Sequence, residues 1–377
     1  MLVLGSVHAF SMFLGSIEEE FATTRSNASL TYSITLAVLT IHVLIGDRIF
    51  RRISPGMLIL VVTLISTTGV LIAGYSSHLY MVWIGYGVMF GAANGLGYSF
   101  ALQYSAQAIP AFRGAAMGLV TAAYGLGAAV APLPFELLLD VYGFRGGMTG
   151  LAFALASTGL CVAFLFARSG HRLLIEKDSR SDYGKCSQRV TLRLWVSYGT
   201  AVAAGLMVIG HATGIAHSGG LPDEWIFIAP TVIAVGNVVG SYFGGYLVDV
   251  WGARRLLYMV SVSSTLSLAI MWGHLSPLTV LLGLAIVGLT YGATIAAFPA
   301  AIANLFGAVR GIRIYGLVFT AWGVAGLLAP WVAGVLFERS NNYTSALLLA
   351  TVLGSVSILS IFWFPNENEI THNDSCS

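Results

Sequence analysis

Twelve long apolar runs, separated by short polar breaks, leave this chain few possible folds. An apolar segment of about 20 residues crosses a bilayer as an α-helix, because backbone polar groups in lipid need partners within the protein. Charged residues make up only 9% of the chain and mean hydropathy is +0.83, which excludes a water-soluble globular fold. The runs lie near residues 1–16, 29–46, 57–75, 79–107, 114–138, 147–167, 194–214, 225–248, 256–274, 277–304, 313–337 and 344–364. The predicted fold class is an all-α membrane protein with twelve transmembrane helices.

The first run, residues 1–16, is short for a spanning helix. At about 1.5 Å per residue it covers about 24 Å of a hydrocarbon core of about 30 Å. We therefore expect this helix to be N-terminally truncated, with the natural protein beginning upstream of Met1. A signal peptide is not expected, because no basic region precedes the run and no cleavage-like polar junction precedes Ile17.

Basic residues collect on one side of the membrane when the ends of alternate helices are placed together. That side takes 15 of the 18 Lys and Arg residues, and only Arg25, Arg145 and Arg339 fall opposite. The positive-inside rule makes this side cytoplasmic, so both termini are expected inside and the protein in the cytoplasmic (inner) membrane. The longest polar break, residues 169–192, is predicted to be a cytoplasmic linker, and residues 366–377 a cytoplasmic tail.

The two halves of the chain repeat each other. Residues 118–125 read GLVTAAYG, and residues 316–323, 198 positions later, read GLVFTAWG. Matched pairs are Gly118 with Gly316, Tyr124 with Trp322, Pro132 with Pro330, Gly91 with Gly288, and Gly95 with Gly292. The repeat predicts two pseudo-symmetric six-helix bundles, residues 1–168 and 193–365. Two such bundles can rock about a midplane site and expose it to each side in turn.

One loop carries a recognisable signature. Residues 245–255 place a Gly, three residues, Asp249, then Gly252 and the basic pair Arg254 and Arg255. This segment resembles the loop signature of the major facilitator superfamily. Further short segments make the chain similar to that superfamily's oxalate/formate antiporter and monocarboxylate porter branch: residues 5–10 before 18–21, 91–98, Arg113-Gly114 before 125–127, 142–145, His211 with Gly219, and 315–330.

The resemblance implies a function and a fold. It implies the major facilitator fold and a secondary transporter, not an enzyme, that moves a small solute by alternating access. A monocarboxylate or related small organic acid is the expected substrate, with a proton or a counter-substrate as the coupled partner.

Asp249, Arg254 and Arg255 are the predicted gating residues. Charges at the cytoplasmic edge can pair with helix ends and hold two bundles together. Gly245 is expected to let the helices at 225–248 and 256–274 approach closely. The equivalent first-half segment, residues 46–53, has Phe50 where the Asp belongs, so Asp249 is the better candidate. The alternative is a short polar turn that merely obeys the positive-inside rule.

Polar side chains inside the predicted spans mark the expected transport path, because each costs free energy unless paired or wetted. The superfamily architecture implies that the first, fourth, seventh and tenth helices line a central cavity, next to the second, fifth, eighth and eleventh. On these helices the predicted substrate-binding residues are His8, Asn94, Tyr98, Tyr124, His211, Asn237, Ser241, Tyr291 and Trp322. For each of them the alternative is an interhelical hydrogen bond or a packed aromatic ring.

Two departures from the family pattern limit the substrate. Aligning Asn237-Val-Val-Gly-Ser241 with the branch's Asn-x-x-Gly-Arg places Ser241 at the Arg position, and Trp322 stands where the branch carries Lys. A dianion such as oxalate would then lack a fixed counter-charge. A monocarboxylate moving with a proton through His8 or His211 fits better, as does a neutral polar or aromatic solute stacking on Trp322 and Tyr124. A sensor that kept the scaffold but no longer cycles is a further alternative.

Several kinds of chemistry lack their sequence signals. The chain contains no Gly-rich phosphate loop followed by Lys, no HExxH motif and no Cys/His metal spacing. We expect no catalytic residues, no cofactor, no metal site and no nucleic-acid partner; the partners are the solute and the lipid bilayer. Glu136, near the outer end of its run, is either a proton site or an interfacial carboxylate facing water.

Overall fold

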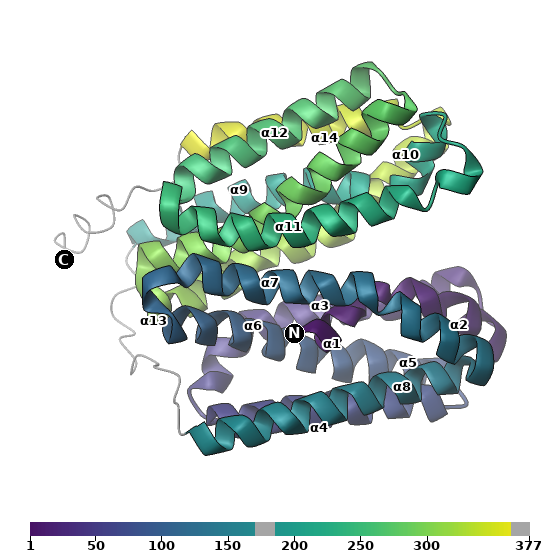
Figure 1. Cartoon of the computed structure of the whole chain (residues 1–377), viewed down its shortest axis with the longest axis vertical. Helices are drawn as coiled ribbons and strands as arrows, with labels where there is room; N and C mark the ends of the chain where they lie inside the picture. The colour runs from purple at the N-terminus through teal and green to yellow at the C-terminus, as the bar shows by residue number, and fades with distance from the viewer. Residues whose placement is uncertain (170–184, 363–377) are drawn as a thin grey trace. The chain divides into compact units, whose positions relative to one another are not determined.

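The computed structural model describes residues 1–169 and 185–362, which form helices joined by short turns (Figure 1). In this described part, 10 segments are long and apolar enough to cross a membrane. One of them, Pro110–Ser169, contains a break at Gly143 and therefore holds two spans. Together with the short helices before Phe21, these segments match the predicted apolar runs. The predicted all-α membrane fold is confirmed.

The chain divides into two compact units. Unit 1 comprises Met1–Tyr104 and Ala123–Ile175, and unit 2 comprises Ser105–Ala122 and Glu176–Ser377. The division falls inside helix α7 (Arg113–Val130), whose first half groups with unit 2. Most of the expected linker at 169–192 lies outside the described residues, as does the expected tail at 366–377. Helix α9 already begins at Lys185, within the segment expected to be linker.

Unit 1 contains two helices with irregular hydrogen-bonding. Its elements are α1 (Leu2–Gly5), η1 (Ser6–Phe13), α2 (Leu14–Glu20), α3 (Arg25–Phe50), α4 (Pro55–Tyr75), α5 (Leu79–Val82), η2 (Trp83–Phe90), α6 (Gly91–Ala108) and α8 (Pro132–Ser169), with the second half of α7. The segment η1 is a 3₁₀ helix and η2 is a π-helix, so the first and fourth predicted spans each change helix type along their length. Such segments are uncommon and are found at hinges and functional sites.

Glycines let the neighbouring helices approach the fourth span closely, in the π-helix and just after it. A side chain at Gly69 of α4 would meet Cβ of Met89 at 2.7 Å, and Gly85 of η2 faces the carbonyl of Gly69 in return. One turn further along, a side chain at Gly91 would meet the Thr35 carbonyl of α3 at 2.8 Å. Small residues therefore let α3 and α4 pack directly on the fourth span, as expected in lipid, where tight packing substitutes for a hydrophobic driving force.

Unit 2 has longer and more regular helices. Its elements are α9 (Lys185–Ile209), α10 (Ala212–Ser218), η4 (Asp223–Trp225), α11 (Ile228–Trp251), α12 (Ala253–Gly273), α13 (Pro277–Ser340) and α14 (Thr344–Phe362), with η3 (Pro110–Phe112) and the start of α7. The continuous ribbon of α13 is two spans, because Gly307 has φ 77° and interrupts the helix. Only glycine adopts that conformation readily, so Gly143 and Gly307 mark the turns between successive spans in the two units.

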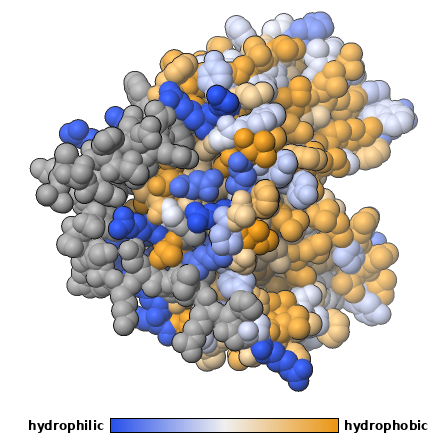
Figure 2. Space-filling model, turned by 60° about the vertical axis from the view of Figure 1, so that its left-hand side comes forward, coloured by the Kyte–Doolittle hydropathy of each residue, from blue (hydrophilic) through white to orange (hydrophobic). Residues whose placement is uncertain are grey.

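Local sequence signals begin and end these helices. A capping box formed by Ser276 and Thr279 starts α13, with Pro277 in its first turn. The left-handed residue Asn341 ends the same helix. On the outside the helices present apolar side chains such as Phe153, which is 74% exposed. Figure 2 shows hydrophobic residues over much of the helical surface and hydrophilic residues gathered toward one side of that view. An apolar surface of this kind is the one expected to face lipid.

Candidate functional site

His8 lies in the 3₁₀ segment of the first helix and pairs with an aromatic residue of the second. Its Nδ1 lies 2.7 Å from the hydroxyl of Tyr32 in α3. The His8 ring also meets the Tyr124 ring edge to face, with centroids 5.5 Å apart. Either group can be the donor in this hydrogen bond, because its direction depends on which imidazole nitrogen carries the hydrogen. Tyr32 was missed by the sequence analysis, since no motif or spacing relates it to His8.

Asn94 and Tyr124 join three helices of unit 1. The Tyr124 hydroxyl donates to Asn94 Oδ1 at 2.8 Å, and Asn94 Nδ2 donates to the Leu4 carbonyl at 2.7 Å, close to where α1 passes into η1. Tyr98, one turn after Asn94, packs on the Tyr124 ring at 4.9 Å between centroids. Four predicted residues, His8, Asn94, Tyr98 and Tyr124, therefore form one polar and aromatic group inside unit 1.

Tyr291 and Trp322 form the corresponding pair in unit 2. The Trp322 indole Nε1–H donates to the Tyr291 hydroxyl at 3.0 Å. The Trp322 ring stacks on Phe319 with centroids 5.1 Å apart and an interplanar angle of 15°. Trp322 is 6% exposed, so both its polar and its apolar surfaces are in contact with the protein.

These two hydrogen bonds occupy equivalent positions in the internal repeat. Tyr124 matches Trp322, and Asn94 matches Tyr291, because the glycines around Asn94 recur around Tyr291. Each half thus joins its fifth span to its fourth through an aromatic donor, with Asn94 as acceptor in one half and Tyr291 in the other. Both pairs are neutral, so neither supplies a fixed charge to a solute.

Asn237 and Ser241 are drawn into helix packing. Ser241 is completely buried, and its hydroxyl lies 3.3 Å from Asn237 Oδ1 and 3.2 Å from the Gly292 carbonyl of α13. Next to it, Gly240 faces the Leu289 carbonyl, so α11 and α13 touch along this stretch. The position that aligns with the family's arginine therefore carries a side chain satisfied by its own helix and by α13.

His211 lies apart from the Tyr291 and Trp322 pair. It stands between α9 and α10, where the seventh predicted span is interrupted, and its Nε2 is 2.9 Å from the Pro330 carbonyl. The Tyr343 hydroxyl lies 3.4 Å from Nδ1. Burial raises the pKa of Tyr343, so its hydroxyl keeps its proton and can donate to that nitrogen. A neutral imidazole with its hydrogen on Nε2 satisfies both contacts, which gives His211 a structural reason to be there.

Asp249 caps a helix other than its own. The Gly114 amide donates to Oδ1 and the Ala115 amide to Oδ2, each at 2.9 Å. Both amides belong to the first turn of α7, whose N–H groups have no partner within the helix. The carboxylate also opposes the partial positive charge at that helix terminus. The predicted interaction of Asp249 with a helix end is thus present within unit 2.

In the rest of the loop signature, Gly245 lies against α7, Arg254 contacts the end of α14 and Arg255 is exposed. Gly245 was expected to face the helix at 256–274, and this was wrong: it faces Gly114 and lies against Gly118 of α7, where an added Cβ would meet the Gly118 Cα at 2.6 Å. This close approach is what brings the α7 amides to Asp249. Arg254 donates to the Phe362 carbonyl at the end of α14, 3.1 Å away, and Arg255 is exposed.

The structure also bears on the remaining titratable groups. Glu136 and Asp140 are both exposed on α8. Among the described residues, no group of three or more His, Cys, Asp or Glu side chains could hold a metal ion.

Comparison with known proteins finds similarity to membrane transporters over most of the chain. The family model of the Major Facilitator Superfamily matches residues 1–222 and 194–375. An uncharacterized MFS-type transporter of Escherichia coli, YhjX, is 24% identical over 86% of this chain and 82% of its own. Monocarboxylate transporter 13 of Rattus norvegicus is 25% identical over 93% and 82%. The oxalate:formate antiporter of Oxalobacter formigenes is 23% identical over 73% and 68%.

Solved structures share the fold at low sequence identity. The proton:xylose symporter XylE matches with a TM-score of 0.77 at 12% identity, covering 97% of this chain and 93% of its own. The transporter FucP in its outward conformation matches with a TM-score of 0.74 at 13% identity, covering 97% and 98%. Sequence family and fold agree, and the chain belongs to the major facilitator superfamily of membrane transporters.

Proposed function

We propose that this protein is a secondary transporter that moves a monocarboxylate or a related small organic acid, together with a proton, by alternating access. The observation that carries the proposal is the pair of equivalent neutral clusters: Tyr124 with Asn94 in unit 1, and Trp322 with Tyr291 in unit 2. His8 lies beside the first cluster. Relatives named as monocarboxylate transporters support the substrate class.

A proton offers a way to move an acid through neutral surroundings. A carboxylate carried alone would lose its hydration without gaining a fixed cation, at a cost of several kcal/mol. Protonation of the acid makes the solute itself neutral, and protonation of His8 gives the carboxylate a neighbouring cation; either one removes most of that cost. The bond between His8 and the Tyr32 hydroxyl supplies a neighbouring group for that proton.

A neutral polar or aromatic solute is the second candidate. The stacked rings of Phe319 and Trp322 and the contact between Tyr98 and Tyr124 favour it, because flat apolar rings bind flat solutes by stacking. A sensor that binds without cycling is the third candidate. Uptake into proteoliposomes separates it from the first two, since a sensor would bind solute and accumulate none.

Competition by oxalate tests the substrate class. When a panel of labelled small acids, sugars and aromatic solutes is added outside proteoliposomes, a monoacid is expected to accumulate inside, and an inward proton gradient is expected to speed its uptake. Oxalate is expected not to compete at concentrations where unlabelled monoacids do, because its second charge would be desolvated without a partner. Equal competition by oxalate would refute the argument from neutral clusters, and accumulation of a neutral solute alone would favour the second candidate.

The orientation of the protein can be tested with one cysteine. The basic asymmetry predicts that Cys186, at the start of α9, is cytoplasmic. A variant with Cys161→Ala and Cys376→Ala retains Cys186 alone. An impermeant maleimide should leave this variant unlabelled in intact cells and label it after permeabilisation. Labelling in intact cells would reverse the proposed topology. A Ser169→Cys variant in the same background with Cys186→Ala added provides a second, independent reporter.

A further inference from the structure

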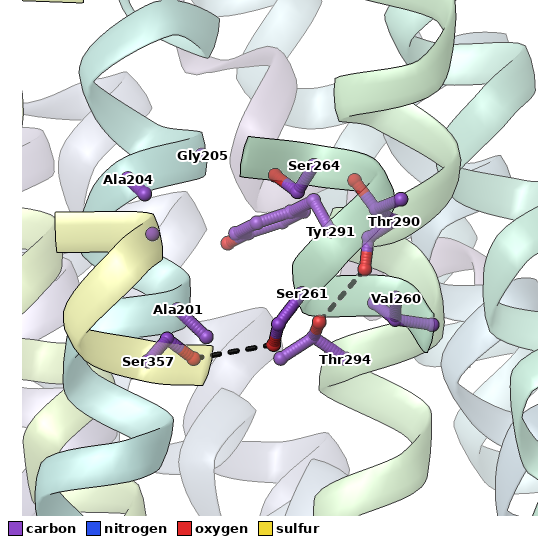
Figure 3. Close-up of a pocket in the computed structure, with 11 residues that line it drawn as sticks. Ala201, Ala204, Gly205, Val260, Ser261, Ser264, Thr290, Tyr291, Thr294 and Ser357 are labelled. Atoms are coloured by element: carbon purple, nitrogen blue, oxygen red, sulfur yellow. Dashed lines mark hydrogen bonds between the residues drawn. The ribbon is translucent and has the colours of Figure 1, made fainter. Parts of the chain in front are cut away.

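Unit 2 contains a small, partly open cavity lined by hydroxyl groups (Figure 3). Its volume is about 10 Å³, and its walls come from α9, α12, α13 and α14. The lining hydroxyls belong to Ser261, Ser264, Thr290, Tyr291, Thr294 and Ser357. None of the lining residues is charged. So many hydroxyls around one space inside a membrane domain call for an explanation, because buried polar groups cost free energy unless they are paired.

The hydrogens of several hydroxyls are already committed. Thr290 donates to the Ile286 carbonyl and Thr294 to the Thr290 carbonyl, both at 2.8 Å within α13. Ser261 and Ser357 lie 3.2 Å apart, so one donates to the other across α12 and α14. A hydroxyl that already donates one hydrogen bond can still accept others through its oxygen lone pairs. The cavity is therefore rich in acceptors and suits an occupant that can donate.

The size and neutrality of the cavity limit that occupant. A space of about 10 Å³ admits roughly one water molecule, which needs two to four polar partners. A sodium ion would fit by size, but a charge here would have no carboxylate beside it. We propose that the cavity is a binding site for one structural water molecule, which donates to the oxygens of Thr294 and of the Ser261 and Ser357 pair.

Tyr291 connects this site to the proposed transport path. Its ring reaches across the cavity in Figure 3 and packs on Gly205 of α9, while its hydroxyl accepts from Trp322. Water that fills the space behind the ring holds Tyr291, and through it Trp322, in one position. The proposal of a water site does not depend on the proposed function. The proposed effect of the water on solute binding does depend on it.

Thermal unfolding of purified protein tests the site through paired variants. Ser261→Ala and Ser357→Ala should each lower the melting temperature by about 2 °C. With water present, the double variant should lose more than either single variant, because each oxygen holds the water separately, and less than the two single losses together, because the two hydroxyls share one direct hydrogen bond. In a dry cavity the two hydroxyls serve only each other, and the double variant should lose no more than either single one. Ser355→Ala, on the exposed side of α14, is the matched control and should change little.

Two further measurements complete the test. A high-resolution structure of the wild-type protein should show one ordered water within hydrogen-bond distance of Ser357 or Thr294; an empty cavity would refute the proposal. The melting temperature should be the same in sodium and choline chloride, and a sodium-specific rise that Ser357→Ala removes would assign the site to a cation instead. In uptake assays the double variant should raise KM about 3-fold or more, whereas Ser355→Ala should not. If water is found and KM is unchanged, the link to Trp322 is wrong.

Discussion

Asp249→Asn is expected to reduce solute uptake by at least about 10-fold while leaving membrane insertion unchanged. The substitution keeps the size of the side chain but removes its charge, and it turns an –NH₂ group toward one of the two amides at the start of α7. Hydrogen bonds to a charged group contribute about 1.5–3 kcal/mol, and a charge at a helix terminus about 0.3–1 kcal/mol. Their loss should free the start of α7 from the end of α11.

The expected effect on transport follows from the fact that helix α7 belongs to both units. Its first half groups with unit 2 and its second half, from Ala123 on, with unit 1. Asp249 therefore holds the beginning of a helix that carries Tyr124 in its second half. A carboxylate that fixes this helix in one state of the cycle and releases it in another is expected to govern how often the cycle runs.

Initial rates of uptake, normalised to the amount of protein in the liposomes, measure this effect. Asp223→Asn provides the matched control, because it removes the same charge from a side chain that is 88% exposed. Gel filtration and the melting temperature report insertion and folding separately. If Asp249→Asn transports at the wild-type rate, Asp249 does not gate transport and the loop is only a short polar turn. An unfolded Asp249→Asn protein would make the contact a condition of folding instead of a gate.

Much of the fold could be predicted from the sequence, because every segment that crosses lipid has to be an apolar helix of about 20 residues. Apolar length alone located the helices. The two bundles that the repeat predicts stay a prediction. The irregular segments were not predicted. The π-helix at Trp83–Phe90, where Gly85 packs against Gly69, has no signature in the pattern of apolar residues. The break at His211 was missed because no proline or run of polar residues marks it.

Only part of the candidate site could be predicted, because the sequence shows polar residues within spans but not the contacts that form when helices pack. Polar residues within spans were easy to find, and four of them do gather in unit 1 around Tyr124. Their partners were not predicted, because the Leu4 carbonyl, the Tyr32 hydroxyl and the α7 amides are defined only once the helices pack. Sequence alignment gave Ser241 the place of a substrate-binding arginine, whereas packing turns its hydroxyl toward α13.

Ser241→Arg is expected to destabilise the protein strongly and to add no affinity for dianions. The serine is completely buried between α11 and α13, where its neighbours are the Asn237 amide and the Gly292 carbonyl. Overpacking a filled site costs about 1–3 kcal/mol. An unpaired buried guanidinium adds about 3–5 kcal/mol, the range measured when one partner of a buried ion pair is removed. Combining the change with Trp322→Lys should be worse, since that substitution also removes the ring stacked on Phe319.

Ser241→Ala separates packing from charge at the same position. It removes only the hydroxyl and should cost about 1 kcal/mol, so its melting temperature should stay close to that of the wild type. Denaturation of Ser241→Arg, Ser241→Ala and the wild type in one detergent measures the difference, and oxalate competition measures the gain in anion affinity. A stable Ser241→Arg protein that binds oxalate would mean that the arginine reaches an open space. Position 241 would then contribute to the selection of substrate charge, and the argument that packing against α13 removes its side chain from the solute's path would be wrong.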